Sequence, residues 1–219
     1  MLAAQSEIMT DVKELLKMLK KMYPEAKYYL EFSSPFELLV AAILSAQCRD
    51  EIVNLTTRPL FAKYAKPEDY AKARLSQIEQ DIKSITFYKN KAKMLKGASE
   101  VLISDYKGRV PDRMEDLMKL QGVGRKTANA ILINAFDKIE GITVDTHVIR
   151  LSFRIGLTKH KDPALIEQDL MKLIPKAEWK TIPYLLKDHG RAICTAPTPK
   201  CSRCLVSYLC EKNGVTKRL

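Results

Sequence analysis

The chain has 219 residues, of which 46% are apolar, and 37 lysines and arginines outnumber 26 acidic residues to give a formal net charge of +11. Such a chain can bury a core without help from disulfides, and the cationic surplus along its whole length favours a polyanionic partner, either nucleic acid or an anionic membrane surface. No apolar run reaches the length of about 18 residues that a spanning helix needs, and residues 1–7 lack a signal-peptide pattern, so a cytoplasmic, nucleoid-associated protein without a membrane partner is predicted.

Apolar residues recur at helical spacing almost throughout the chain, which predicts an all-α fold. The first helix carries an apolar stripe made of Ile8, Val12, Leu15, Leu16 and Leu19. Residues 36–46 are apolar all round, as a central buried helix would be. Further helices are predicted near 51–64, 75–84, 89–105, 113–119, 125–136, 146–155, 163–173 and 178–189. No flexible linker separates these elements, so any domain division must be tight.

Residues 114–136 predict two helices joined by the turn Gly122-Val123-Gly124, which is the helix–hairpin–helix plan. Glycines allow positive φ and close approach, and the second helix begins there with unpaired N–H groups and the positive end of its dipole. A DNA phosphate fits such a site, with Arg125 and Lys126 beside it. The alternative is an ordinary connection between two helices.

Asp145 lies in a short extended stretch that leads into an apolar helix at 148–155. By itself this position indicates a helix N-cap, because an aspartate accepts hydrogen bonds from the first free backbone N–H groups. His147 and His189 are interpreted as structural histidines rather than acid–base groups.

Four cysteines crowd near the C-terminus in the pattern Cys194-x6-Cys201-x2-Cys204-x5-Cys210. In a reducing compartment such a group indicates a metal site rather than disulfides. Four thiolates suit either a tetrahedral zinc ion or an iron–sulfur cluster, and the number of ligands does not decide between them. Cys48 stands apart and is interpreted as a small, buried or half-buried thiol.

The segment LQGVGRKTANAILINAF, followed by VDTHVIRLSFRIGL, closely resembles the endonuclease III family of helix–hairpin–helix DNA glycosylases and abasic-site lyases. The resemblance extends from about Phe32 to Cys210. It implies the helix–hairpin–helix DNA glycosylase fold, with a six-helix domain at 30–137. An iron–sulfur cluster domain would be formed by 1–29 and 138–219.

The resemblance also implies the site residues. Lys126 would be the nucleophile that attacks the sugar C1′ and forms a Schiff base, and Asp145 would be the catalytic carboxylate. The activity implied is a bifunctional one: excision of oxidised or ring-saturated pyrimidines from duplex DNA, followed by β-elimination that cleaves 3′ to the abasic site. The protein would act as a monomer, and Lys126 and Asp145 would lie at the mouth of a DNA cleft between the two domains.

The cysteine spacing after His189-Gly190-Arg191 resembles the [4Fe–4S] loop of the same family, which makes the cluster the expected cofactor and zinc the alternative. Lys200 and Arg203 would place positive charge of this loop against DNA phosphates.

Two further residues are implied as DNA contacts. Gln47 matches the glutamine that fills the gap left by an extruded nucleotide, and Phe87 matches a loop residue that intrudes on the opposite strand. Thr86-Phe87 replaces the usual Gly-Leu, and core packing is the alternative for Phe87. Gln121 stands where the family usually has proline.

Two other functions are kept open. One is a monofunctional adenine or thymine mismatch glycosylase, which usually lacks the hairpin lysine. The other is a non-catalytic DNA-binding module that binds abasic DNA without cutting it.

Overall fold

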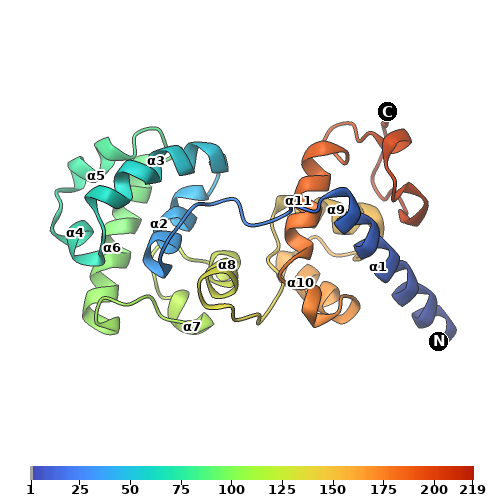
Figure 1. The fold of residues 1–219 in the computed structure, drawn as a ribbon, viewed down its shortest axis with the longest axis horizontal. Coiled ribbons are helices and arrows are strands. Elements are labelled where there is room, and N and C mark those ends of the chain that lie inside the picture. Colours follow the sequence, from blue (N-terminus) through green and yellow to red (C-terminus); the bar gives the residue numbers. More distant parts are fainter. Residues whose placement is uncertain (1) are drawn as a thin grey trace. The chain divides into compact units, whose positions relative to one another are not determined.

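The computed structural model describes the backbone of residues 2–219 and the side chains from residue 11 onward. Within that range all regular secondary structure is helical, which confirms the predicted all-α fold. The chain forms two compact units, a continuous unit at Tyr29–Glu140 and a split unit made of Met1–Tyr28 with Gly141–Leu219 (Figure 1). No helix among the described residues is long and apolar enough to cross a membrane. The domain boundaries predicted at 30 and 137 stay a prediction, since these units are defined by packing alone.

The continuous unit is built around the apolar helix α2, which contacts α3, α6 and α8. Phe36 and the seven residues from Leu38 to Leu44 are buried, as the all-round apolar pattern predicts. The helices of this unit are α2 (Pro35–Ser45), α3 (Asp50–Lys63), α4 (Pro67–Lys72), α5 (Leu75–Asp81), α6 (Tyr88–Tyr106), α7 (Met114–Leu117) and α8 (Arg125–Phe136).

The start of α2 is fixed by side chains next to it in sequence. Ser34 Oγ accepts a hydrogen bond of 3.1 Å from Glu37 N, and Glu37 Oε2 accepts one of 2.5 Å from Ser33 N. This reciprocal capping satisfies N–H groups that would otherwise be unpaired at a helix start, and Pro35 supplies a backbone angle already suited to the first turn.

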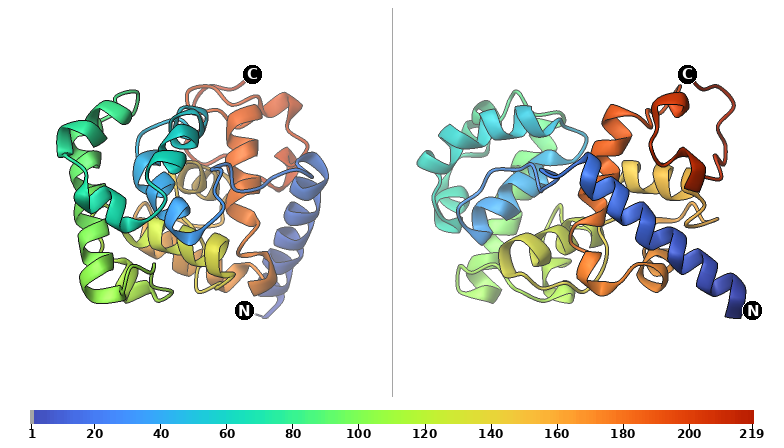
Figure 2. Two further views of the ribbon diagram at one scale, coloured as in Figure 1. Left: turned by 60° about the vertical axis from the view of Figure 1, so that its left-hand side comes forward. Right: turned by 45° about the vertical axis from the view of Figure 1, so that its right-hand side comes forward.

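The split unit combines α1 (Leu2–Met22) with α9 (Thr146–Ile155), α10 (Pro163–Leu173) and α11 (Ile182–Ala192). Figure 2 shows α1, in dark blue, lying beside the orange helix α11. The predicted stripe on α1 is confirmed where side chains are described, since Val12, Leu15, Leu16 and Leu19 are all buried. The side chain of Ile8 lies outside the described residues.

Two elements differ from the sequence-based expectation. The last helix occupies Ile182–Ala192 rather than 178–189, because a short 3-10 turn at Lys176–Glu178 precedes it and Pro183 fits only the first turn of a helix. The helix α4 was not predicted. It begins at Pro67, and Asp69 accepts a hydrogen bond of 3.1 Å from Lys66 N. A proline at the first helical position and an acidic residue that caps the helix therefore mark its start.

Gly190 marks the closest approach of α11 to α9. A Cβ at this position would lie 2.7 Å from His147 Nδ1, 2.8 Å from Arg150 Nη2 and 3.2 Å from Leu151 Cδ1. The Arg150 guanidinium cannot move away easily, because it donates hydrogen bonds to the carbonyl oxygens of Gly190 and Cys194. Any larger residue at 190 would therefore force these side chains or the two helices apart.

We expect Gly190→Ala to lower the free energy of unfolding by about 1–3 kcal/mol, the usual cost of overpacking. The measurement is the urea midpoint followed by circular dichroism. Gly97→Ala in α6 is the matched control, because the atoms nearest to its Cβ would be the end of the long, exposed Gln121 side chain, which has room to turn away. Equal midpoints for the two variants would contradict the account of α9–α11 packing.

Candidate active site and cysteine pocket

The hairpin turn connects α7 to α8, and its two glycines have different roles. Gly122 has a φ of 82°, which disfavours any residue with a Cβ. Gly124 is the N-cap of α8, with a φ of −96° and no side chain capping the helix. A Cβ at Gly124 would meet no atom within 4 Å. The first glycine thus makes the turn possible, and the second leaves the N-terminus of α8 open to a partner.

Buried side chains on both sides of Gly124 fix the turn and α8 in the core of the continuous unit. Val123 is buried, and so are the residues of α8 from Ala128 to Ile133. The polar start of α8 therefore lies at the surface of a helix that is otherwise fixed in the core. An anion placed there would face unpaired N–H groups and the positive end of the helix dipole.

Lys126 lies on the first turn of α8 and is exposed. Its amine makes no hydrogen bond or ion pair with any residue from 11 to 219, whereas many other lysines of this unit are paired with carboxylates or carbonyl groups. Arg125 lies beside it at the start of the helix. The predicted location of Lys126 is confirmed, and the amine is accessible to a molecule bound at the hairpin.

Gln121 stands where proline was expected, and its side chain packs against the neighbouring helix. Its side chain lies against α6 at Gly97, where a Cβ would overlap the side-chain amide of Gln121. The neighbouring Gly122 lies over the side chains of Met94 and Ile43. Side-chain packing on α6 and α2 thus supports the turn where a proline ring would have restricted it.

Asp145 caps α9, as its position in the sequence predicts. Its Oδ1 atom accepts hydrogen bonds from His147 N at 2.8 Å and from Val148 N at 2.9 Å. The other carboxylate oxygen has no hydrogen-bond partner among the described residues. The carboxylate is therefore held in one orientation by one oxygen while the second remains available. Lys126 belongs to the continuous unit and Asp145 to the split unit.

Both histidines near these residues have structural contacts. His147 Nδ1 lies 3.2 Å from Arg150 Nη2, and burial lowers the pKa of His147. His189 is buried, its Nδ1 lies 3.0 Å from the Tyr23 hydroxyl, and burial lowers its pKa to about 4. His189 is therefore neutral at physiological pH, which agrees with its interpretation as structural.

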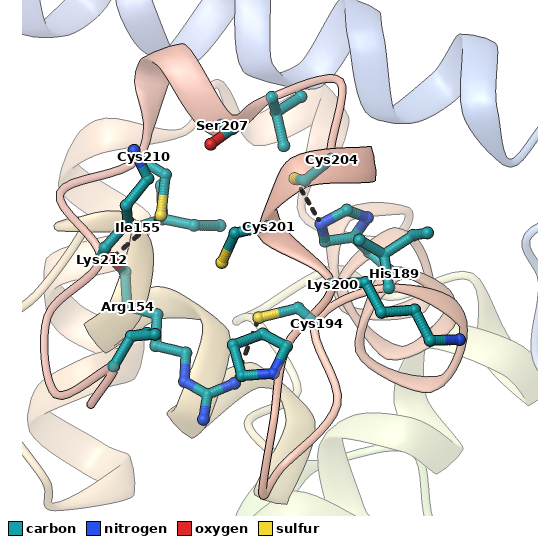
Figure 3. Close-up of a pocket in the computed structure, with 14 residues that line it drawn as sticks. Arg154, Ile155, His189, Cys194, Lys200, Cys201, Cys204, Ser207, Cys210 and Lys212 are labelled. Atoms are coloured by element: carbon teal, nitrogen blue, oxygen red, sulfur yellow. Dashed lines mark hydrogen bonds between the residues drawn. The ribbon is translucent and has the colours of Figure 1, made fainter. Parts of the chain in front are cut away.

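The four cysteines predicted as metal ligands surround one pocket of the split unit. Figure 3 shows Cys194, Cys201, Cys204 and Cys210 around this space, with the sulfur atoms of Cys194, Cys201 and Cys210 turned toward its middle. All four are half-buried free thiols. As the side chains stand, no three cysteine, histidine or acidic groups in the described part of the chain are close enough together to hold a single metal ion.

The chemistry of these donors fits a group that carries positive charge. Burial is the largest cause of the raised pKa of the Cys204 and Cys210 thiols. Backbone hydrogen bonds oppose this shift in part, and neighbouring cysteines add to it. Four thiolates around one pocket would repel one another and lose solvation, so a bound cationic group would stabilise them.

Two residues contact the sulfur atoms, and sequence reasoning did not assign this role to either. Arg154 Nη1 lies 3.4 Å from Cys194 Sγ and also donates to Thr195 O at 2.8 Å. His189 Nε2 lies 3.4 Å from Cys204 Sγ. The available signal was an arginine within the apolar segment 148–155, because a charge buried on such a helix requires a partner.

The two cationic side chains predicted on the cysteine loop differ in how freely they can contact a partner. Arg203 is exposed, on the 3-10 turn Cys201–Arg203. Lys200 Nζ donates a hydrogen bond of 3.2 Å to Ala192 O, so this side chain also braces the end of α11.

Gln47 and Phe87 are both exposed on turns of the continuous unit, and both have left-handed backbone angles, with φ of 54° and 58°. Phe87 is 61% exposed, so the core-packing alternative is wrong for this residue. It directly precedes α6 as the N-cap. Their exposure is that expected of residues that contact a partner.

Comparison with known proteins identifies the family. The family model described as "HhH-GPD superfamily base excision DNA repair protein" matches residues 40–176. Endonuclease III of Synechocystis sp. is 49% identical over 197 residues, which cover 90% of both chains. A solved structure of a trapped endonuclease III–DNA covalent intermediate superposes with a TM-score of 0.88 at 43% identity, covering 93% of this chain and 96% of the other.

A thermostable thymine-DNA glycosylase has a TM-score of 0.81 at 27% identity, with 93% of this chain and 96% of the other covered. This second enzyme shares the fold at a lower sequence identity. The family model matches more than half of the residues, and the sequence identity to endonuclease III of Synechocystis sp. extends over nine-tenths of both chains. The chain therefore belongs to the endonuclease III family of the HhH-GPD superfamily of base excision DNA repair proteins.

Proposed function

We propose that this chain excises oxidised or ring-saturated pyrimidines from duplex DNA and cleaves at the abasic site, with Lys126 as nucleophile and Asp145 as catalytic carboxylate. Membership of the endonuclease III family makes it a bifunctional DNA glycosylase and abasic-site lyase. The observation that carries the residue assignment is an exposed, unpaired lysine on the first turn of α8, beside the open helix N-terminus at Gly124.

The position of Lys126 suits attack on a sugar carbon. The bare N–H groups at the start of α8 would hold a DNA phosphate, and Arg125 would add charge beside it. A nucleotide held by that phosphate would present C1′ to the amine on the same first turn. Attack there forms a C–N bond while the bond to the base breaks, and loss of the proton from nitrogen with opening of the sugar gives the Schiff base. Removal of a C2′ proton then expels the 3′ phosphate by β-elimination.

Asp145 would act on the same nucleotide through its free carboxylate oxygen. Positive charge develops on the sugar as the base leaves, and a fixed anion nearby stabilises it. The same oxygen could accept a proton from the attacking amine. The hydrogen bonds to Oδ1 keep the carboxylate from rotating. Its charge is therefore already oriented when positive charge develops on the sugar, and no reorientation is needed in the transition state.

Duplex DNA with a damaged base or an abasic site is the proposed partner of a monomeric protein. Gln47 and Phe87 would enter the space left by the extruded nucleotide, which a glycosylase must support while the base is outside the stack. Arg203 on the cysteine loop would contact backbone phosphates, with Lys200 as a second, more constrained cation.

Cys194, Cys201, Cys204 and Cys210 would hold a [4Fe–4S] cluster, whose role in this account is to stabilise the split unit and to position the cationic loop. The shared pocket supports this assignment, because four cysteine thiolates are the ligand set that such a cluster takes. Reduced thiols also agree with a cytoplasmic, nucleoid-associated location.

Borohydride trapping on two duplex substrates separates the two catalytic roles. With an abasic site or an oxidised pyrimidine in the duplex, the wild type should form a covalent adduct, and Lys126→Ala should form none on either. Asp145→Asn keeps the N-cap, because asparagine caps as well as aspartate. It should therefore fold normally, lose base release by about 100-fold or more, and still be trapped on the preformed abasic site.

Lys119→Ala is the matched control, since Lys119 is an exposed lysine of the same hairpin that is already paired with Asp116. It should be trapped like the wild type. An adduct that persists in Lys126→Ala would refute the nucleophile assignment. Base release without any adduct in the wild type would indicate a monofunctional glycosylase, and binding without base release would indicate a DNA-binding module.

The cofactor assignment makes a separate prediction. Purified protein should be brown and contain about four iron atoms with matching sulfide per chain. Cys201→Ser should lose the visible absorbance and lower the unfolding midpoint, because ligand loss removes binding energy that stabilises the fold. Cys48→Ser, which changes the thiol outside the pocket, should keep both. A colourless wild type with one bound zinc ion would overturn the assignment.

A further inference from the structure

Lys91 is a buried lysine of α6 for which the proposed chemistry has no role. Only 4% of its surface is exposed, yet it has no carboxylate partner among the described residues. Its ammonium group instead donates to two backbone carbonyl oxygens, Leu44 O at 2.8 Å and Ala46 O at 2.6 Å. Burial lowers the pKa of Lys91, and the nearby Cys48 opposes this shift in part.

The two carbonyl groups belong to the C-terminus of α2. Carbonyl groups in the last turn of a helix lack partners within the helix and carry the negative end of its dipole, so a cation is favoured there. The Lys91 ammonium therefore caps α2 from a neighbouring helix. Immediately after the capped residues comes Gln47, exposed and with a φ of 54°.

The backbone of Lys91 is joined to the second exposed turn. Lys91 N donates to Phe87 O at 3.1 Å, which closes the first turn of α6. Phe87 precedes that turn with a φ of 58° and a largely exposed ring. One residue thus contacts the turn that carries Gln47 through its side chain and the turn that carries Phe87 through its backbone.

Both exposed residues have backbone angles that are unfavourable for residues other than glycine. Such conformations persist only where the surroundings fix them. A side chain that must enter a DNA helix benefits from being held in advance, because the ordering cost is then met during folding rather than on binding.

We propose that Lys91 is a positioning residue that holds Gln47 and Phe87 at a fixed spacing for entry into duplex DNA. This inference rests on the proposed function, which gives those two side chains their role. It goes beyond that function in assigning the spacing of the two turns to one buried cation. Lys91 itself would not touch DNA.

The same helix offers a matched control. Lys96 also caps a helix from α6, donating to Ala71 O and, at 3.0 Å, to Ala73 O at the C-terminus of α4. It is joined to neither exposed turn. Lys91→Met and Lys96→Met both remove an ammonium group from two carbonyl oxygens while keeping an unbranched chain. Lys96 is half-buried and also lies 4.0 Å from Glu100 Oε1, so its replacement loses a further polar contact, but away from the two turns.

The test is a binding experiment that requires no chemistry. A duplex carries a tetrahydrofuran abasic analogue opposite 2-aminopurine, whose fluorescence rises when it is unstacked. At saturating protein, Lys91→Met should lose most of the fluorescence increase and bind this duplex about 10- to 100-fold more weakly. Lys96→Met should match the wild type, and both variants should cleave a single-stranded abasic site at rates within about twofold of wild type.

A Gln47→Ala background provides the second arm. If Lys91 acts through Gln47, the loss of affinity caused by Lys91→Met should be smaller in that background, because coupled residues give non-additive effects. Where Lys91→Met does not accumulate as folded protein, Lys91→Gln replaces it, since one donor group is retained and an intermediate loss is expected.

The inference is overturned if Lys91→Met unstacks the base as the wild type does, if Lys96→Met is equally impaired, or if the effects of Lys91 and Gln47 are additive. It is also overturned if the wild type leaves 2-aminopurine stacked. A wild type that unstacks the base but cleaves no abasic site would instead contradict the proposed role of Lys126, and leave the positioning role of Lys91 supported.

Discussion

The burial of α8 is the constraint on which the proposed active site depends. Residues Ala128 to Ile133 and the turn residue Val123 are fixed in the core of the continuous unit, while the two glycines expose the first N–H groups of the helix. A helix N-terminus attracts phosphate only if its N–H groups are uncovered and its direction is fixed. The same arrangement fixes the place of Lys126, because the lysine lies on the first turn at the open end. Without the apolar anchor, the lysine would be one more solvated cation.

Helix ends recur at each proposed functional position. Lys126 lies on the first turn of α8, Asp145 is the N-cap of α9, and Lys91 caps the C-terminus of α2. Terminal backbone groups are the only ones that a helix leaves unpaired, so an all-helical protein has these places at which to orient polar groups. The cysteine pocket follows the same pattern, since the loop that carries it begins where α11 ends, and Arg154 from α9 reaches Cys194.

Much of this could be predicted from the sequence because the signals are local. The hairpin glycines, the position of Lys126 and the capping role of Asp145 each depend on a few adjacent residues. The helix α4 was missed because a six-residue element has too few residues to show periodicity, although Pro67 and Asp69 mark its start. The contacts of Arg154 and His189 with cysteines, and of Lys91 with α2, join residues far apart in the sequence. Such contacts depend on the packing of helices, which no local pattern encodes.

The central claim is that the reactive amine is that of Lys126, and locating the covalent bond tests it most directly. Borohydride-reduced adduct of the wild type on abasic DNA can be digested with trypsin and nuclease, and the modified peptide sequenced by mass spectrometry. The account predicts a sugar remnant on Lys126 and, because a modified lysine resists trypsin, no cleavage between Lys126 and Thr127. A remnant on another lysine or on the N-terminal amine, with Lys126 unmodified, would contradict it.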